Sequence, residues 1–332
     1  MPKISIIIIN YNAEKTIGSC LNSVLTQSWH KKEIIIIDNA STDRSLEILK
    51  TNFSSVKIIK NTENFGYSKA ANQGIRETDG DFVMIMNPDI VLEPDYIEKI
   101  LECAEKHPKT GAFSGKLLKY NFELGIKTNI FDSTGLYCYR NRRIIDRGQG
   151  LKDFGQYENE EEVFGVTGAA PIYRREALEM VKINDEYFDE DFFMYKEDID
   201  LTWRMRLFGW SSYYVPKAVS YHGRGTGVLK RFTHWEVAKN RRRLSRFQKS
   251  LAYRNQRLMQ IKNEMPKNFI KDALQIFVKE FLILGYIVVR EPYLLSSVYE
   301  LLKTIPKAIK KRKIIMNRKI ASQESMQKWF QS

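Results

Sequence analysis

The feature that most constrains the fold is an alternation of apolar and amphipathic segments in the N-terminal quarter of the chain. Helix-compatible segments at 13–26, 43–51 and 67–78 separate short apolar runs, rich in isoleucine and valine, at residues 4–9, 33–37, 56–59 and 82–86. Near-continuous apolar strands alternating with helices are typical of a parallel sheet that is covered on both faces. The sequence therefore predicts an α/β fold, with a mostly parallel sheet flanked by helices.

Polar, turn-forming residues follow each of the four apolar runs. They are Asn10, Tyr11 and Asn12 after the first, Asp38 and Asn39 after the second, Asn61, Asn64 and Gly66 after the third, and Asn87, Pro88 and Asp89 after the fourth. Such residues are ordinary in loops. Parallel sheets nevertheless bind ligands at the carboxyl ends of their strands, and polar residues at all four exits favour a binding site at that edge.

The kind of ligand follows in part from motifs that the sequence lacks. It has no GxGxxG after the first strand, no GxxxxGK[ST], no G-x-S-x-G and no HExxH, so the signatures of dinucleotide oxidoreductases, P-loop proteins and common hydrolases are missing. The Gly-rich N-terminal loop of a nucleotidyltransferase is missing too. We expect a nucleotide binder of another kind, in which Asp38 accepts from a base or ribose and Asn64 to Gly66 present backbone N–H groups.

Two side chains are candidates for binding a metal ion. Asp89 follows the fourth strand, where a carboxylate can hold a Mg²⁺ or Mn²⁺ ion that neutralises a diphosphate. His222 follows an expected strand at 212–219 and precedes a Gly-rich segment, which makes it a candidate second ligand. Each residue alone is a weak signal, because Asn-Pro-Asp also makes a good turn and a lone histidine is more often structural.

Glu197 and Asp198 begin an expected helix at 197–208, in which Asp200 can pair with Arg204 at i,i+4. Acids in a first turn are commonly partners of the helix dipole. The same field keeps a carboxylate ionised, as a general base requires. One of the two acids at the helix start is therefore a candidate base.

The middle of the chain, residues 110–165, is less regular. A hairpin is expected within 131–145, around residues 139–142, and the glutamate run at 158–162 is expected to be a solvated loop. The three cysteines, Cys20, Cys103 and Cys138, are widely spaced and predict neither a zinc site nor a disulfide framework. A reducing cytoplasm fits this cysteine usage.

Taken in order, these segments resemble the inverting family 2 glycosyltransferases, and within them most of all the bacterial rhamnosyltransferase-like branch. The resemblance runs from Ile4 to about Thr226 and rests on Ile8-Ile9-Asn10-Tyr11-Asn12, Ile37-Asp38-Asn39-Ala40-Ser41-Thr42-Asp43, Asn64-Phe65-Gly66 with Asn72, Asn87-Pro88-Asp89, Thr167-Gly168-Ala169-Ala170 and Glu197-Asp198-Ile199-Asp200-Leu201. No single piece is specific, but the ordered series is.

The resemblance implies a GT-A fold that binds a nucleoside diphosphate sugar. The residues it assigns are Asn10, Tyr11, Asp38, Asn64, Gly66, Asn72, Asn87 and Asp89 on the donor side, Gly168, Ala169 and Arg204 on the acceptor side, Asp89 with His222 at a divalent metal, and Asp198 as the inverting base with Glu197 as the alternative. The family's commoner metal motif has an acid at both ends of Asp-x-Asp. Asn87 stands first here, as also occurs in the rhamnosyltransferase-like branch.

The expected reaction is transfer of L-rhamnose from dTDP-rhamnose, or of a hexose from a UDP-sugar, in bacterial cell-surface polysaccharide synthesis. The acceptor is expected to be a hydroxyl of a lipid-linked glycan. The base removes the proton of that hydroxyl as it attacks the anomeric carbon, and a single displacement inverts that carbon.

The net charge of +13 is concentrated towards the C-terminus. Residues 235–332 hold 22 Lys and Arg against 7 Asp and Glu, about +15, whereas residues 1–234 are near neutral. We therefore expect a catalytic domain at 1–234 and a helical, basic appendage at 235–332 that binds a polyanion. An apolar stretch at 273–289, flanked by basic clusters at 241–243 and 310–313, is too short and too charged for a membrane span.

That stretch favours an interfacial helix on the anionic, inner face of the plasma membrane. Two alternatives stay open: a helix packed on the catalytic domain with a solvated basic face, and a nucleic-acid-binding module. The second is disfavoured, because the sequence has no recognised nucleic-acid motif and no interleaved aromatic platform. The N-terminal apolar run is too short for a signal peptide or a span and is expected to be a buried strand.

Overall fold

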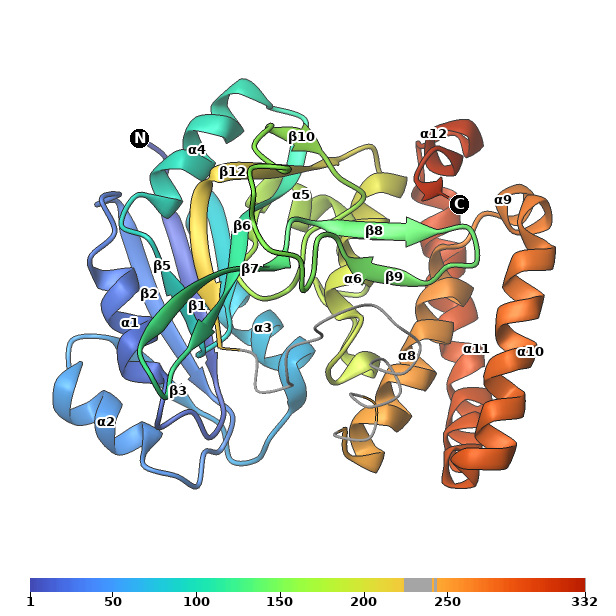
Figure 1. The fold of residues 1–332 in the computed structure, drawn as a ribbon, viewed down its shortest axis with the longest axis horizontal. Helices are drawn as coiled ribbons and strands as arrows, with labels where there is room; N and C mark the ends of the chain where they lie inside the picture. Colours follow the sequence, from blue (N-terminus) through green and yellow to red (C-terminus); the bar gives the residue numbers. More distant parts are fainter. Residues whose placement is uncertain (224–240, 242–243, 332) are drawn as a thin grey trace.

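The computed structural model describes residues 1–223, 241 and 244–331. Figure 1 shows a twisted sheet with helices on both faces and a group of C-terminal helices against one flank, which confirms the predicted α/β fold. The helices are α1 Ile17–Leu25, α2 Ser45–Asn52, α3 Gly66–Arg76, α4 Tyr96–Lys106, α5 Arg175–Val181, α6 Glu197–Leu207, α8 Arg246–Asn263, α9 Pro266–Lys271, α10 Ala273–Arg290, α11 Leu295–Arg318 and α12 Gln323–Gln327, with 3-10 turns η1 Glu190–Phe192 and η2 Pro292–Leu294.

The main sheet has the strand order β10-β12-β6-β11-β4-β1-β2-β3. The strands are β1 Ile4–Asn10, β2 Lys32–Asp38, β3 Lys57–Lys60, β4 Phe82–Met86, β5 Ile90–Leu92, β6 Thr110–Asn121, β7 Ile126–Ser133, β8 Leu136–Tyr139, β9 Ile144–Asp146, β10 Glu161–Glu162, β11 Ile172–Arg174, β12 Ser211–His222 and β13 Phe330–Gln331. β1 to β4 are mutually parallel, β11 runs antiparallel between β4 and β6, and β12 is parallel to β6.

The apolar runs become strands because both faces of the sheet are covered. Every residue of β1 and of β4 is buried. Side chains of a strand alternate between the two faces, so Ile7 and Ile9 of β1 enter one core cluster while Ile6 and Ile8 enter the other. The first cluster also holds side chains from α3, α6 and the C-terminal helices, and the second holds those of α1 and α4.

The irregular middle of the chain differs in part from expectation. The predicted hairpin exists as β8 and β9, but residues 126–133 form β7, which pairs with β6. The glutamate run is not entirely a solvated loop, because Glu161 and Glu162 pair with Tyr214 and Tyr213 of β12. The backbone of β12 gives the two glutamates a strand partner that their own sequence does not reveal.

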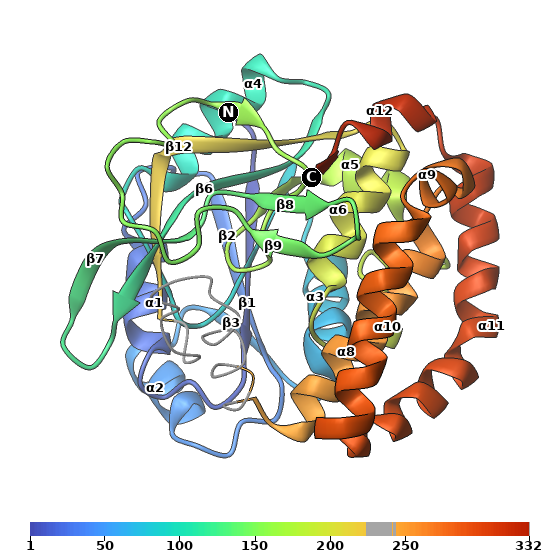
Figure 2. The same cartoon turned by 45° about the vertical axis from the view of Figure 1, so that its right-hand side comes forward.

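The C-terminal helices pack directly on the catalytic part of the chain. α8 lies between α6 and α11 and contacts both (Figures 1 and 2). Leu258 and Met259 of α8 and Ala308 and Ile315 of α11 belong to the same core cluster as Trp203 of α6, and β13 pairs with β8. The expected domain boundary at 234/235, the Gly-rich segment after Gly223 and most of the basic cluster at 241–243 lie outside the described residues.

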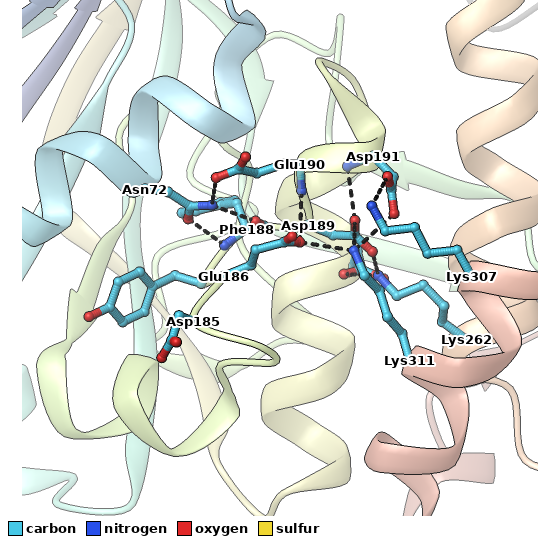
Figure 3. A network of polar contacts seen from close by, with 12 residues as sticks. Asn72, Asp185, Glu186, Phe188, Asp189, Glu190, Asp191, Lys262, Lys307 and Lys311 are labelled. Atoms are coloured by element: carbon cyan, nitrogen blue, oxygen red, sulfur yellow. Dashed lines mark hydrogen bonds and ion pairs between the residues drawn. The ribbon is translucent and has the colours of Figure 1, made fainter. Parts of the chain in front are cut away.

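Part of the basic charge of the C-terminal region is satisfied within the chain. Lys262 of α8 and Lys311 of α11 both contact the buried carboxylate of Asp189, Lys262 also lies 2.9 Å from Asp200, and Lys307 pairs with Asp191 at 2.6 Å (Figure 3). The charges of the two lysines hold the pKa of the Asp189 carboxyl well below its ordinary value, against the effect of burial. The prediction that this charge calls for an external polyanion is therefore corrected for these lysines.

The turn between β8 and β9 is joined to the C-terminal helices by Arg142, whose side chain is 0% exposed. Its guanidinium binds both carboxylate oxygens of Glu264, lies 2.8 Å from Asp272 and stacks 3.6 Å from the ring centroid of Phe330. Replacing one partner of a buried ion pair usually costs several kcal/mol, because the other charge is left uncompensated.

We predict that Arg142→Ala lowers the free energy of unfolding by about 3–5 kcal/mol, since Glu264 loses its counterion. The control is Arg143→Ala at the adjacent, exposed position, which should change stability by less than about 0.5 kcal/mol. Urea denaturation followed by circular dichroism measures both. Equal stability of the two variants would show that Arg142 does not join the turn to the helices energetically.

Candidate active site

The first two strand exits meet at the carboxyl edge of the sheet. Asn10, the last residue of β1, lies beside Asp38, the last residue of β2, and its Nδ2 donates to Asp38 Oδ1 at 2.7 Å. Ser41 Oγ donates to the same oxygen at 2.6 Å. Asn10 and Asp38 are fully buried, whereas Tyr11 is 48% exposed. The two buried residues therefore hold the ends of β1 and β2 together, and the side chain of Tyr11 is open to solvent.

The third exit leads into the start of α3. Asn64 Oδ1 accepts from the N–H of Gly66 at 2.9 Å. Gly66 has φ +80, and the ring of Phe193 lies 2.6 Å from where a Cβ would be, so both backbone conformation and space require glycine here. The N–H of Ser68 also donates to the carbonyl of Phe193 at 3.1 Å. The predicted nucleotide-side loop thus contacts the segment that precedes Asp198.

Asn72 has a different position from the one expected on the donor side. It is fully buried in α3, its Nδ2 donates to the carbonyl of Phe188 at 2.8 Å, and its Oδ1 accepts from the N–H of Phe188 at 2.8 Å (Figure 3). A buried amide that pairs both of its groups with one backbone residue serves as a brace. We therefore correct its assignment from ligand binding to holding the 188–190 segment.

The two predicted metal ligands are neighbours in the structure. His222 Nε2 lies 3.3 Å from Asp89 Oδ1, and His222 Nδ1 lies 2.8 Å from Asp132 Oδ2. Burial alone would lower the pKa of the His222 imidazole, but the carboxylates of Asp89 and Asp132 raise it to about 9. Burial raises the pKa of Asp89 while the charge of His222 lowers it, with a net decrease.

This donor set fits a divalent cation. An oxygen and a nitrogen at this spacing suit Mn²⁺ or Mg²⁺, which would displace the proton from His222 Nε2 and be completed by oxygens of a diphosphate. Asp132 takes the position of the carboxylate that commonly orients a metal-binding histidine through its other nitrogen. Sequence reasoning missed Asp132 because it is a single, fully buried acid in a segment without a recognisable motif.

Another set of possible metal ligands lies elsewhere. Cys103, His107 and Glu160 place their ligand atoms within 4.8 Å of one another, at the end of α4 and in the segment before β10. The wide spacing of the cysteines along the chain gave no sign of this arrangement. None of the three was predicted as a site residue, and none belongs to the Asp89–His222–Asp132 group.

Glu197 and Asp198 lie side by side at the start of α6 but in different electrostatic conditions. Asp198 Oδ2 accepts from the N–H of Gly168 and Oδ1 from the N–H of Ile199, both at 2.8 Å. Burial raises the pKa of Asp198, and these two donors oppose the shift. Burial and the charge of Asp198 raise the pKa of Glu197 well above its ordinary value. Burial therefore favours the protonated form more strongly at Glu197, whereas two backbone N–H donors stabilise the ionised form of Asp198.

Gly168 and Ala169 connect the base candidate to the metal motif. A Cβ at Gly168 would lie 3.0 Å from Cβ of Asp198, so a larger residue would displace the carboxylate. The next carbonyl, that of Ala169, accepts from the N–H of Asn87 at 3.0 Å, and Tyr67 Oη donates to the carbonyl of Gly168 at 2.9 Å. One short stretch of backbone therefore links Asp198 to the loop that carries Asp89.

Arg204 does not lie on the acceptor side, and that assignment is wrong. Its side chain is 1% exposed, and its guanidinium donates to the carbonyls of Val181 and Tyr187 at 2.6 Å. The predicted pair with Asp200 is present at 3.1 Å. Arg204 is therefore a buried brace between α5 and α6, since every one of these partners is within the core.

The segment before α6 was not recognised from sequence. Phe193, Tyr195 and Lys196 have φ of +61, +70 and +73, a region that bulky residues rarely adopt. Strain of this kind costs of the order of 1–3 kcal/mol per residue and gathers at functional sites. No glycine or asparagine marks the turn, so the sequence carried no signal for it.

Residues 5–181 match the family described as Glycosyl transferase family 2. The chain belongs to that family. Curated relatives include the poly-beta-1,6-N-acetyl-D-glucosamine synthases of Staphylococcus epidermidis and Staphylococcus aureus, which are 29% and 28% identical over 222 residues, 66% of this chain and 49% of those proteins. The chain thus spans about half the length of the curated relatives it matches.

Solved structures with the same fold include S. aureus TarS 1-349 in complex with UDP-GlcNAc, with TM-score 0.56, 17% identity and coverage of 95% of this chain and 87% of that one. The mannosyltransferase of Pyrobaculum calidifontis in complex with GDP-Man and Mn2+ gives 0.53, 16%, 96% and 86%. At these identities the likeness shows the fold alone. The predicted GT-A fold and the enzyme class, a glycosyltransferase, are confirmed, and the rhamnosyltransferase-like branch is not singled out.

We predict that Asp198→Asn lowers kcat by at least about 10²-fold with little change in donor affinity, the usual scale for losing a general base. Glu197→Gln resembles the protonated glutamic acid and should keep most of the activity. Steady-state kinetics with donor binding measured separately checks both variants. The reverse outcome would assign the base to Glu197.

The pH dependence of the same enzyme gives an independent check. A base acts only when ionised, and burial raises the pKa of Asp198, so kcat should rise with pH through a midpoint above the ordinary aspartate value of about 3.9 and then level off. A pH–rate profile of the wild-type chain measures this rise of kcat with pH, the acid limb of the profile. A kcat that stays constant down to the ordinary value would contradict a raised pKa.

Proposed function

We propose that this chain is an inverting glycosyltransferase that moves a sugar from a nucleoside diphosphate to a hydroxyl of a glycan acceptor. The observation that carries the proposal is the connection between Asp198 and Asn87 through Gly168 and Ala169. It joins a candidate base to the metal motif by two hydrogen bonds across one short backbone segment.

The reaction follows from the chemistry of the residues at the two ends of this connection. An acceptor hydroxyl is a poor nucleophile at neutral pH, so the ionised Asp198 would remove its proton as it attacks the anomeric carbon from the face opposite the phosphate. The carbon is inverted because there is one displacement and no protein nucleophile. Asp89 and His222 would hold the divalent cation, which when bound supplies stabilisation of the charge on the leaving diphosphate.

Two donors have specific support. A fold neighbour binds UDP-GlcNAc and curated relatives are named as N-acetylglucosamine polymer synthases, which favours a UDP-hexose. Asn87 in the first position of the metal motif, as in the rhamnosyltransferase-like branch, favours dTDP-rhamnose. We take UDP-GlcNAc as the first donor to test and dTDP-rhamnose as the second.

The test is a thermal-shift screen of nucleotide sugars with Mn²⁺, followed by transfer assays with any donor that binds. A ligand that binds only the folded state raises Tm by an amount that grows with the logarithm of its concentration relative to Kd. UDP-GlcNAc or dTDP-rhamnose should raise Tm and should be consumed on addition of an acceptor glycan. If no nucleoside diphosphate sugar shifts Tm, the proposed function is wrong.

We predict that Asp89→Ala and chelation by EDTA each abolish transfer while the chain stays folded. Asp89 is partly exposed, with 27% of its side chain accessible, so its loss should leave the core unchanged. Circular dichroism checks the fold, and readdition of Mn²⁺ should restore the chelated wild type but not the variant. Full activity in EDTA would refute the role of the metal.

We further propose that the chain lies on the anionic, cytoplasmic surface of the membrane through α10, where a lipid-linked glycan would reach Asp198. Ile276 and Ile287 of α10 are buried against the protein. The opposite side is apolar and exposed, with Leu274 at 74%, Phe277 at 60%, Phe281 at 77%, Val288 at 56% and Val289 at 75%. No helix in the described part of the chain is long and apolar enough to cross a membrane.

The charge around α10 supports a lipid surface as the partner. Lys271 and Arg290, both exposed, lie at the two ends of the helix, and α10 is at the outer edge of the molecule in Figure 1. Anionic lipid attracts each nearby Lys or Arg by about 1 kcal/mol, and the buried apolar area adds to that.

We predict that the full chain sediments with anionic liposomes at low salt and that Phe281→Asp with Val289→Asp prevents this. The matched control is Leu124→Asp, at a side chain 68% exposed on the turn between β6 and β7, which should leave binding unchanged. If the wild type stays in the supernatant, the membrane proposal fails. If it instead forms dimers that the α10 variant dissociates, the face binds a second copy.

A further inference from the structure

The backbone segment just before Asp198, residues 193–196, is enclosed on two sides. On one side the N–H of Ser68 donates to the carbonyl of Phe193 at 3.1 Å, and the ring of Phe193 fills the space left by Gly66. On the other side lies α8, from the C-terminal region, which contacts α6. The segment 193–196, which contains the residues at positive φ, therefore lies between α3 and α8.

Asn255 is the residue of α8 that meets this segment. It is fully buried, and its Nδ2 lies 2.8 Å from the carbonyl oxygens of Phe192 and Met194 and 2.9 Å from that of Tyr195. These carbonyls surround the residues at positive φ. The Phe192 carbonyl also accepts from the N–H of Met194 at 2.7 Å, so the two N–H groups of this buried amide mainly serve the carbonyls of Met194 and Tyr195.

Further contacts of α8 reach the same segment. Gln248 Nε2 donates to Tyr195 Oη at 2.8 Å, and Arg254 donates to the carbonyl of Asp191 at 2.6 Å. The ion pairs of Lys262 and Lys311 with Asp189, shown in Figure 3, hold the residues just upstream. Among these contacts, only Asn255 binds the backbone on both sides of Phe193.

We propose that Asn255 is a positioning residue for the transfer reaction, which sets the Asp198 carboxylate through the 193–196 backbone. The proposal rests on the proposed function for its kinetic consequence. It makes the C-terminal helical region a part of the active site, since a residue 57 positions after the base in the sequence fixes the base in space.

The expected kinetic effect of replacing Asn255 follows from the hydrogen bonds that Asp198 would lose. Its carboxylate is held by the N–H groups of Gly168 and Ile199, which lower its pKa. If the 193–196 segment relaxes, these hydrogen bonds lengthen, the pKa of Asp198 rises, and the acid limb of kcat moves to higher pH. A misplacement of about 1 Å can cost about 10²-fold in rate. Donor affinity should change little, because the donor-side residues are untouched.

The experiment compares Asn255→Leu with Asn263→Leu in the full chain. Asn263 is the matched control: it lies in α8, is equally buried, and its Nδ2 donates to the carboxylate of Asp200 at 2.8 Å, whereas that of Asn255 donates to the 192–195 backbone. Both variants lose a buried hydrogen bond and should lose stability, so activity is measured well below the Tm of each. Asn255→Ser, which keeps one donor in a smaller side chain, is the second variant in case Asn255→Leu does not fold.

Asn255→Leu should lower kcat by about 10²-fold with donor KM within about threefold, and its acid limb should move up in pH. Asn255→Ser should have an intermediate kcat, and Asn263→Leu should keep both the wild-type kcat and the wild-type position of the acid limb. Hydrogen exchange of amides 193–199 should speed up in Asn255→Leu but not in Asn263→Leu, which tests the structural half even if the wild type transfers no sugar. Unchanged exchange in a folded Asn255 variant, or equal loss of kcat at both positions, overturns the proposal.

Discussion

The geometry of this molecule depends on a short piece of backbone that cannot hold its own conformation. Phe193, Tyr195 and Lys196 lie at positive φ, at a cost of the order of 1–3 kcal/mol each. The carbonyl of Phe193 accepts from the N–H of Ser68 and that of Tyr195 from Asn255, and these two donors belong to helices far apart in the sequence. The start of α6, and with it Asp198, therefore has a fixed place only when α3 and α8 are both packed.

This constraint explains why the C-terminal helices are integral to the fold although their composition suggests a separate appendage. Their lysines neutralise Asp189 and Asp200 in the core, and their apolar residues complete the cluster that includes Trp203. One side of α10 is left without apolar cover, and so are Leu295, Tyr299 and Leu302 of α11. Net charge and hydrophobic content could not separate these roles, because a lysine that pairs with a buried acid and one that faces solvent are identical in sequence.

The sequence predicted those parts of the fold that depend on local periodicity. Isoleucine-rich runs such as that of β1 have few alternatives to a doubly covered parallel strand, and the four predicted strand exits do lie at one edge of the sheet. The short strands β10 and β11 could not be predicted, because three or fewer residues carry no periodicity. They become strands only by pairing with partners such as β12 and β4.

The residues of the candidate site likewise fall into those that the sequence predicted and those that it misassigned or missed. Asp89 and His222 were correctly predicted to be neighbours, since each follows a strand that ends at the same edge. Asn72 and Arg204 were assigned to the donor and acceptor sides but are buried braces, and burial of a polar residue cannot be read from its identity. Asp132 and Asn255 were missed because each acts through a partner distant in sequence.

The central claim is that Asp89 and Asp198 act on opposite sides of one bound donor. The most direct measurement is a crystal structure of the chain with Mn²⁺ and the donor identified by screening, with the metal located by anomalous scattering. The account predicts a manganese peak about 2 Å from an Asp89 oxygen and from diphosphate oxygens, with the anomeric carbon facing Asp198. A peak at Cys103, His107 and Glu160 with none at Asp89, or an anomeric carbon turned away from Asp198, would contradict it.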